Sequence, residues 1–83
     1  FLYFWGVRQM ENARPLDALN KARGTRVILD LKNGKQMLGK LNAFDIHINV
    51  VLDDCEEKKD GESLRKLGTV FIRGDTIISI SAA

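Results

Sequence analysis

The spacing of apolar residues along this chain changes once, at Gly24. Upstream, in "RPLDALNKARG", Leu16 and Leu19 are three residues apart, Pro15 suits the first turn of a helix, and Gly24 suits its end. This pattern predicts a short helix that is not stable alone and must pack on the rest of the chain. Downstream, apolar residues recur at every second position, as they do in a strand with one buried face.

Strand-like segments fill the rest of the chain. They are "TRVILDLK" (25–32), "KQMLGKLNAF" (35–44), "IHINVVLDDCEE" (46–57), "LRKLGTVFIRG" (64–74) and "DTIISISA" (75–82). Asn33-Gly34 is a strong hairpin signal, Asp60-Gly61 marks a polar turn, and Gly39 inside a strand marks a bend. A short helix and five strands on tight turns predict a mainly β fold, a strongly bent antiparallel sheet that closes toward a small barrel.

The predicted sheet has two open edges. Its last two strands are short and apolar, and exposed apolar edges either aggregate or pair with a partner. A chain of 83 residues buries only a small core, and its single cysteine, Cys55, excludes an internal disulfide. Pairing with identical copies would stabilise such a domain. If one edge pairs with a different edge and the rotation closes, the homo-oligomer is a ring.

Charge is unevenly distributed along the chain, although the net charge is only +2. Residues 1–40 carry eight Lys or Arg against three Asp or Glu, and residues 41–83 carry five against eight. A basic half of this kind either binds a polyanion, with its charge multiplied by the number of subunits, or is an ordinary solvated face. Charge alone favours the solvated face.

The first residues, "FLYFWGV", are apolar but lack the features of a membrane or secretion segment. A spanning helix needs about 20 apolar residues, and a secretory signal needs a positive start and a small-residue cleavage site. We therefore expect no membrane contact, and a single domain over residues 14–83 with residues 1–13 as an appendage. The alternative is that residues 1–9 form a hydrophobic tail that docks on a neighbour. A lone thiol fits the reducing cytoplasm.

Three polar residues interrupt the apolar run "FDIHINVVLDD" at every second position: Asp45, His47 and Asn49. If the strand runs through them, they share one face and the apolar residues between them share the other. A second polar group, Arg73-Gly74-Asp75, lies in a loop between two apolar strands. The regular spacing favours a placed binding surface over a chance interruption.

These side chains suit one flat, hydrogen-bonding partner. A nucleobase can stack between the His47 imidazole and the Arg73 guanidinium. The Asn49 amide can accept from the imino N–H of uracil and donate to its carbonyl, whereas cytosine reverses that pattern. The backbone N–H of Gly74 could reach a second carbonyl, and Asp45 could orient the Asn49 amide. One pocket holds one base, so useful affinity requires several subunits.

Metal, cofactor and catalytic chemistry are poorly supported. One His and one Cys are too few for a zinc site, and the carboxylates of "DDCEE" lack the spacing of a calcium loop and suggest a solvated strand end. "GKQMLGK" matches a phosphate-binding loop until Leu41, where Ser or Thr is needed. His47 could pair with Ser63 or Asp45, but nothing supplies an oxyanion site. We expect no enzyme, no metal and no cofactor.

Two long segments resemble the two motifs of the Sm/LSm family of RNA-binding ring proteins. "GTRVILDLKNGKQMLGKLNAFDIHINVVLDD" is similar to the first motif and "GTVFIRGDTIISI" to the second, with the variable loop "CEEKKDGES" between them. The resemblance runs from about residue 14 to residue 82. It implies a helix that caps a bent five-stranded barrel, and rings formed by pairing the fourth strand with the fifth strand of the next subunit. The implied contact residues are Thr69, Val70, Phe71, Ile72, Thr76, Ile77, Ile78 and Ile80.

The same resemblance implies a pocket for single-stranded, U-rich RNA. Its residues would be His47, Asn49, Arg73 and Gly74, with Asp45 in support and Asp75 beside them. Ile48 stands where Met is common, and Ile72-Arg73 stands where the bacterial branch has a Lys-His pair. This favours an archaeal-type homomeric ring, typically of seven subunits, in RNA processing or ribonucleoprotein assembly. The alternative is a ring-shaped scaffold for protein partners, whose binding would depend much less on salt.

Overall fold

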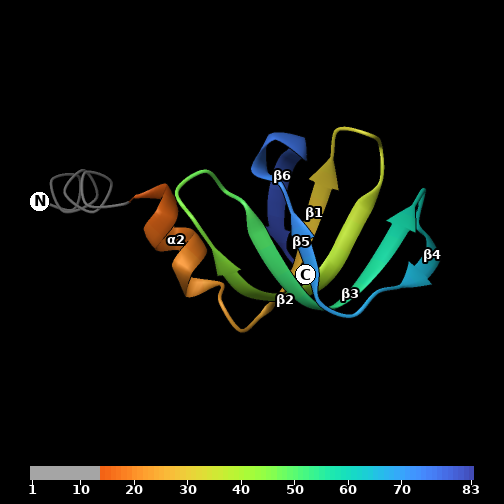
Figure 1. The fold of residues 1–83 in the computed structure, drawn as a ribbon, viewed down its shortest axis with the longest axis horizontal. Coiled ribbons are helices and arrows are strands. Elements are labelled where there is room, and N and C mark those ends of the chain that lie inside the picture. The colour runs from red at the N-terminus through yellow and green to blue at the C-terminus, as the bar shows by residue number, and fades with distance from the viewer. Residues whose placement is uncertain (1–13) are drawn as a thin grey trace, which may run out of the picture.

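The computed structural model describes residues 14–83, and the expected appendage over residues 1–13 lies outside the described residues. The elements are α2 (Pro15–Lys21), β1 (Arg26–Leu31), β2 (Gln36–Phe44), β3 (Val50–Lys59), β4 (Glu62–Lys66), β5 (Val70–Ile72), the 3-10 turn η1 (Gly74–Thr76) and β6 (Ile77–Ala82). The predicted mainly β fold with a short helix before the sheet is confirmed (Figure 1).

The strands form one bent antiparallel sheet in the order β4-β3-β2-β1-β6, and β5 pairs with the first part of β3. The pairing of β2 with β3 is irregular at Gly39, where the register jumps from Leu38 opposite Glu56 to Lys40 opposite Asp53. A Cβ atom at Gly39 would lie 3.0 Å from the carbonyl oxygen of Asp53. The close approach of the two backbones therefore favours glycine here, because a side chain would fit only if the neighbouring atoms shifted by a few tenths of an ångström.

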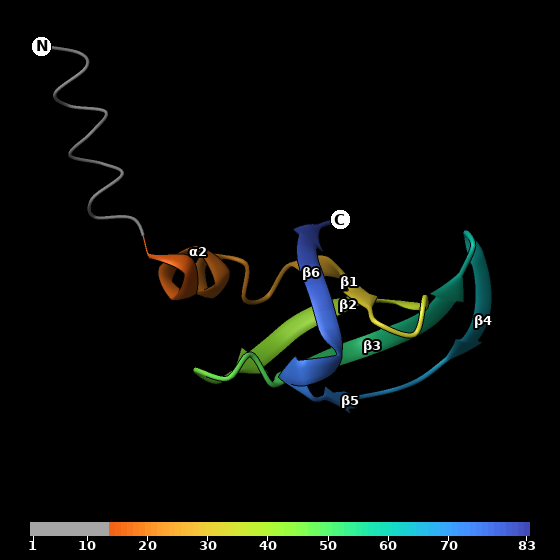
Figure 2. The ribbon, with the colours of Figure 1, turned by 90° about the horizontal axis from the view of Figure 1, so that it is seen from above.

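The core lies inside the bend. Its apolar members come mainly from alternate positions of β1, β2 and β3, as the period of two predicted. The helix lies beside one end of the sheet (Figure 2), and Leu19 and Ala22 pack against the core. The buried apolar residues are Val27, Leu29, Leu31, Leu41, Val50, Leu52, Cys55 and Ile72.

The structure divides the fourth predicted strand into β4 and β5. β4 pairs with residues 56–59 of β3, whereas β5 pairs with residues 50–52. Between them, β3 carries Asp54 in the left-handed region at φ 50°, and Cys55 bonds through its backbone N–H and C=O to Gly68 and Leu67. This local twist in β3 prevents one straight partner strand. The last strand also starts later than predicted, at Ile77, because residues 74–76 form a 3-10 turn.

The two predicted turns are present, with different geometries. At the β1–β2 hairpin only Gly34 is left-handed (φ 84°), and its N–H donates to the Leu31 carbonyl at 3.1 Å. At the β3–β4 hairpin both Asp60 and Gly61 have positive φ, 53° and 81°. Two central residues of positive φ match the twist of the flanking strands.

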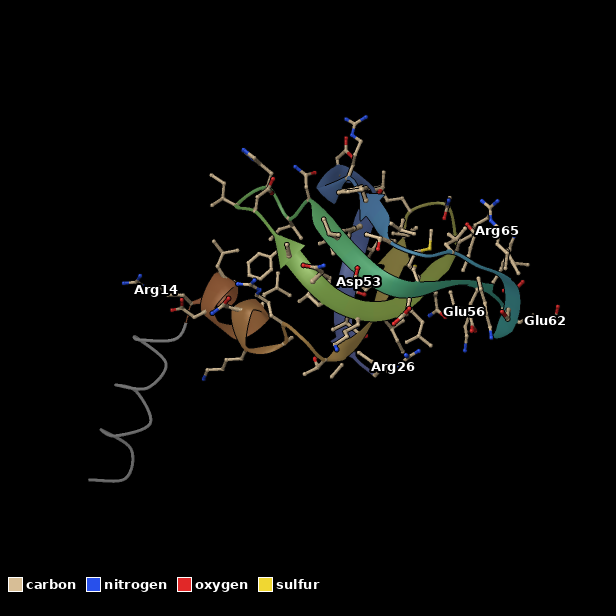
Figure 3. The ribbon with its side chains drawn as sticks, turned by 60° about the horizontal axis from the view of Figure 1, so that its bottom comes forward. Arg14, Arg26, Asp53, Glu56, Glu62 and Arg65 are labelled. Carbon is tan, nitrogen blue, oxygen red and sulfur yellow. The ribbon has the colours of Figure 1, made fainter. Side chains whose placement is uncertain are left out.

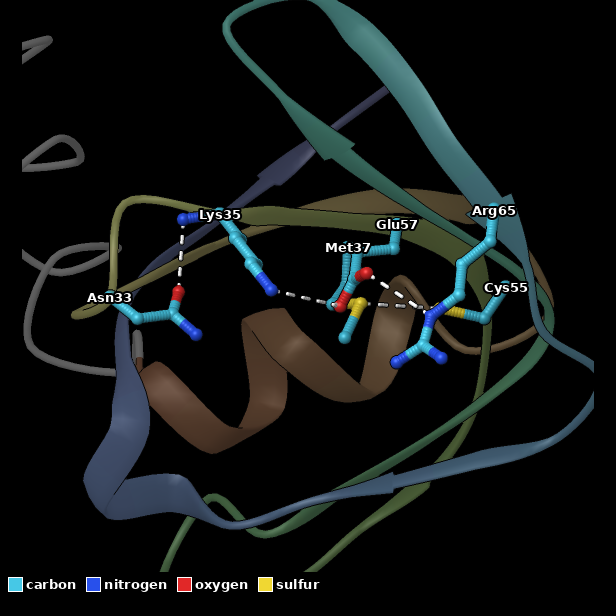
Figure 4. A network of polar contacts seen from close by, with 6 residues as sticks. All are labelled: Asn33, Lys35, Met37, Cys55, Glu57 and Arg65. Carbon is cyan, nitrogen blue, oxygen red and sulfur yellow. Dashed lines mark hydrogen bonds and ion pairs between the residues drawn. The ribbon is translucent and has the colours of Figure 1, made fainter.

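The carboxylate run on β3 is not wholly solvated, and the prediction is wrong for Glu57. The Glu57 side chain is buried, and its Oε1 accepts a charge-assisted hydrogen bond from Arg65 Nε at 3.2 Å. Its Oε2 forms an ion pair with Lys35 Nζ at 4.0 Å (Figure 4). Arg65 stands on β4 at the end of the sheet far from the helix (Figure 3). The Cys55 thiol beside Met37 is also buried, and this burial raises the pKa of Cys55.

Within residues 14–83, the two strands that the family resemblance assigns to a subunit contact, β5 and β6, each have a free edge. β5 pairs only with β3 and β6 only with β1. Each of the two strands carries a large exposed apolar side chain, Phe71 on β5 and Ile78 on β6. The helix found in the described part of the chain is too short to cross a membrane.

Candidate nucleic-acid interface

Residues 45–49 form a tight loop, and the prediction that the third strand runs through them is wrong. β2 ends at Phe44 and β3 begins at Val50. The loop closes with the Ile48 N–H donating to the Asp45 carbonyl at 3.0 Å, and Ile48 has φ 60°. Asp45, His47 and Asn49 are therefore brought together by a turn, not by the alternation of a strand.

The Asp45 carboxylate holds this loop. Its Oδ1 accepts the backbone N–H groups of His47 at 2.8 Å and Asn49 at 3.1 Å, and its Oδ2 accepts from Asn49 Nδ2 at 3.0 Å. Short polar side chains of this kind compete with strand pairing for backbone donors, which explains why the strand stops here. The Asn49 amide, followed by the backbone N–H groups, holds the pKa of Asp45 below its ordinary value.

Asn49 also joins the two predicted polar clusters. Its Oδ1 accepts the backbone N–H of Gly74 at 2.8 Å, although residues 49 and 74 are far apart in sequence. The contact fixes the amide orientation, because Oδ1 faces a donor and Nδ2 faces a carboxylate. It also engages the Gly74 N–H that we expected to face a base.

At the junction of the two loops, Gly74 is needed because there is no space for a side chain. A Cβ atom on it would overlap the carbonyl oxygen of His47 and lie 2.8 Å from the carbonyl oxygen of Ile48. The 45–49 loop and the turn η1 therefore touch backbone to backbone. Close approach is the role that glycine commonly has at such junctions.

Arg73 and Asp75 lie on the η1 side of the junction. Arg73 Nη2 donates to Asp75 Oδ2 at 2.9 Å, and both side chains are exposed to solvent. The pair restricts the guanidinium without burying it. His47 is exposed on the other loop. The structure thus gathers the six predicted residues, Asp45, His47, Asn49, Arg73, Gly74 and Asp75, on two adjoining loops.

An open hollow of about 400 Å³ adjoins these loops. Asp45, Asn49 and Arg73 form its polar side, and the rest of its lining is apolar. His47 does not reach the lining. The remaining lining residues are Ala43, Phe44, Val50, Val51, Phe71 and Ile72.

Sequence patterns missed one side-chain network next to β5. Asp53 accepts from Asn42 Nδ2 at 2.8 Å and from Thr69 Oγ1 at 3.0 Å, which links β2 and β3 to the residue before β5. Asp53 had been grouped with the solvated carboxylates, and no local motif marks its role. Its partners become neighbours only in the folded sheet.

The described residues contain no cluster of three His, Cys, Asp or Glu that could hold a metal ion. Within the same residues, the candidate interface offers an exposed imidazole, an exposed guanidinium and an oriented amide. Flat cationic and amide groups of this kind bind planar, hydrogen-bonding ligands by stacking and by edge contacts.

Several similar proteins come from archaea. The family model described as the LSM domain matches residues 17–82. An snRNP Sm-like protein of Methanococcoides burtonii is 52% identical over 68 residues, which are 82% of this chain and 94% of that protein. The Sm protein of Pyrococcus abyssii, solved in complex with a uridine heptamer, superposes with a TM-score of 0.83 at 41% identity, covering 86% of this chain and 100% of the other. The P. aerophilum SmAP1 heptamer superposes with a TM-score of 0.80 at 34% identity. The match covers 86% of this chain and 95% of a chain of that protein.

Proposed function

This chain belongs to the LSM domain family, and from that premise we propose that it forms a homomeric ring that binds single-stranded, U-rich RNA. The observation that carries the proposal is the Asn49 clamp. One side chain joins the loop with the imidazole to the loop with the guanidinium, and hydrogen bonds on both sides fix its orientation. A preoriented amide can discriminate bases at low entropic cost.

Uracil complements the hydrogen-bonding positions of the Asn49 amide that other protein groups do not use. An amide has two acceptor and two donor positions. Gly74 uses one acceptor position and Asp45 one donor position, so one of each remains for a base. The N3–H and a neighbouring carbonyl of uracil complement this pair, whereas cytosine presents the reverse order. Stacking on His47 and Arg73 would supply affinity without selecting the base.

The ring is supported by relatives and by the free edges. The P. aerophilum protein is a heptamer, and the P. abyssii protein was solved with a uridine heptamer. Here β5 and β6 each have a free edge within residues 14–83, and each can pair with the other strand of a neighbour. We propose seven subunits, with residues 69–72 of one chain against residues 76–80 of the next, and the Sm-like domain over residues 14–83.

The proposed role is binding without catalysis. A pocket for RNA fits a role in RNA processing or ribonucleoprotein assembly. The buried thiol of Cys55, which forms no disulfide, fits a location inside the cell. Backbone phosphates would contact the basic side chains of each subunit, so affinity for RNA should fall steeply with salt. A scaffold that docks proteins through apolar contacts would show little of this dependence.

The test is binding of fluorescent oligo-U, oligo-C and oligo-A to the assembled protein. Arg73→Ala should lower oligo-U affinity by about tenfold or more, given stacking worth about 1–3 kcal/mol per base. Asn49→Ala should have a similar effect because it removes the amide that hydrogen-bonds the base, and the ring mass should stay unchanged in both variants. Lys59→Ala, which removes an exposed cation at the far end of β3, is the control and should bind nearly as the parent does. Equal affinity for the three oligomers, or none, would favour the scaffold.

A further inference from the structure

We propose that Asp53 is a positioning residue that fixes β5 for pairing with the next subunit. The inference rests on the proposed ring, in which residues 69–72 of one chain meet residues 76–80 of the next, and it names what holds the first of these segments in place. Thr69 Oγ1, directly before β5, donates to Asp53 Oδ1 at 3.0 Å. The bond joins the start of β5 to β3 of the same chain.

Backbone pairing alone holds β5 only weakly. The strand has three residues, Val70–Ile72, and they lie opposite residues 50–52 of β3. A ladder of this length supplies few backbone hydrogen bonds, and within residues 14–83 the other edge of β5 has no partner strand. Burial of Ile72 holds the end of the strand. The direction in which β5 sets out therefore depends on contacts at its start.

Two side chains of the β3 region bind the residues that flank β5. Asn49, directly before residues 50–52, accepts the backbone N–H of Gly74 at 2.8 Å. Asp53, directly after them, accepts the hydroxyl of Thr69 at 3.0 Å. The first contact lies beyond the last residue of β5 and the second lies before its first residue. Asp53 thus does at the start of β5 what Asn49 does past its end.

Asn42 orients the Asp53 carboxylate. Asn42 Nδ2 donates to Asp53 Oδ2 at 2.8 Å, which leaves Oδ1 for the Thr69 hydroxyl. The Asn42 carbonyl in turn accepts from Arg23 Nε, just after α2, at 3.2 Å. A carboxylate whose two oxygens each accept a bond from a different element is restricted in rotation, so Thr69 is restricted with it.

The backbone between β4 and β5 leads directly to this contact. Cys55 accepts the N–H of Leu67 at 2.7 Å and donates its own N–H to the Gly68 carbonyl at 3.1 Å. These bonds hold the chain up to Gly68, and the Asp53 side chain holds Thr69, the next residue. The connection is therefore fixed on β3 up to the point where β5 begins.

Ring formation would shield the Asp53–Thr69 bond from water. In the single chain the bond is exposed, and water competes with hydrogen bonds of this kind, so its contribution to stability is small. A strand of the next subunit that pairs along β5 would exclude water beside Thr69, and a hydrogen bond to a carboxylate is stronger where water is excluded. The bond should therefore stabilise the ring more than the isolated subunit.

The experiment is a double-mutant cycle with Asp53→Ala, Thr69→Val and the variant that carries both changes. Ring dissociation is followed by analytical ultracentrifugation over a dilution series at a fixed urea concentration that leaves the subunits folded. Each single variant should raise the protein concentration at which half of the rings dissociate by about tenfold. The double variant should raise it no further, because both changes remove the same bond.

Two further threonine variants serve as controls. Thr69→Ser keeps the hydroxyl, so its rings should dissociate as those of the parent do. Thr25→Val removes a different hydroxyl, which donates to the Ala22 carbonyl at 2.6 Å away from β5. Its rings should also dissociate as those of the parent do.

A second measurement separates positioning of β5 from general stability. Ile78→Glu places a charge on β6 that opposes edge pairing, so changes within single subunits can be measured in that background. There Asp53→Ala should speed amide hydrogen exchange at Val70–Ile72 and leave exchange in β1 unchanged, because only β5 loses a contact at its start.

The outcomes distinguish this inference from the proposed ring. Equal weakening by Asp53→Ala and Thr69→Val, no further loss in the double variant and faster exchange confined to β5 would support it. If neither single variant weakens the ring, or only one does, the bond does not position β5 and the inference is wrong, although the ring stands. Exchange that rises equally in β1 and β5 would make Asp53 a residue of general stability. A parent chain that stays monomeric would overturn the proposed ring and this inference together.

Discussion

Asp45 and Ile48 illustrate, at the scale of single residues, how a strained loop can be kept in one shape. A β-branched residue such as Ile48 in the left-handed region costs about 1–2 kcal/mol, and here φ is 60°. The Ile48 side chain packs against the core, and Asp45 satisfies two backbone donors of the loop. Both contacts offset the strain, so the loop is held in one conformation.

The loop should loosen in acid, because it depends on a charged carboxylate. The pKa of Asp45 is lower in the folded protein than in the unfolded chain, so the unfolded chain binds the proton more tightly. Its stabilising contribution is complete above the ordinary aspartate pKa of about 3.9 and is lost as the pH falls through the lowered folded value. We expect the backbone amide resonances of His47 and Asn49 to titrate in this range.

Two variants assign that titration. Asp45→Asn removes the charge that accepts from both backbone groups, so the two resonances should no longer shift with pH below about 4. Asp30→Asn is the matched control: the pKa of Asp30 is also lowered, by hydrogen bonds from Gln36 and Ser79, but on another part of the sheet. Loss of the titration in Asp30→Asn, or its persistence in Asp45→Asn, would contradict the assignment.

The elements show why sequence patterns found more of the fold than of the site. A period of two identifies β1 correctly because one face of β1 is buried along its whole length. The same period extends falsely through residues 45–49, because hydrogen bonds from the loop to Asp45 replace strand pairing there. The pattern also cannot reveal the twist at Asp54 that separates β4 from β5. That depends on contacts between distant segments.

The candidate site also depends on contacts between residues that are far apart in the sequence. Its residue types could be predicted, since His47, Asn49 and Arg73 stand out in polar segments between apolar ones. The Asn49–Gly74 hydrogen bond could not, because it joins residues that meet only after both loops have formed. The Asp53–Thr69 bond is a further example. Neither bond has a local signal in the sequence.

Docking of the 45–49 loop on η1 should fail if Gly74 gains a side chain. In Gly74→Ala the new Cβ would overlap the His47 carbonyl oxygen, and the surrounding atoms are backbone, which cannot move aside cheaply. We expect the free energy of unfolding, measured by urea denaturation, to fall by about 1–3 kcal/mol, with a parallel loss of oligo-U affinity.

Gly68→Ala provides the matched control for this change. No heavy atom lies within 4 Å of a Cβ built at Gly68, and its φ is not in the left-handed region. Its free energy of unfolding should stay within about 0.5 kcal/mol of the parent value. Equal stability of the two alanine variants would mean that the two loops do not dock as the structure has them.

For the whole molecule, RNA affinity should depend on assembly, and one surface charge should reduce both. Ile78 is 67% exposed on β6, at a free edge that we propose pairs with β5 of the next subunit. A charge on such an edge opposes strand pairing, so Ile78→Glu should yield folded monomers. Oligo-U affinity should then fall by about a hundredfold or more, because the sites no longer act together on one strand.

Leu64→Glu tests whether the position of the charge matters. Leu64 is 48% exposed on β4, away from the two edges proposed to meet, so this variant should stay a ring and bind oligo-U as the parent does. Mass is measured by analytical ultracentrifugation and folding by circular dichroism. A ring that persists in Ile78→Glu would place the subunit contact elsewhere. Monomers that bind oligo-U as tightly as the ring would mean that one subunit holds a complete site, and that the ring serves another purpose.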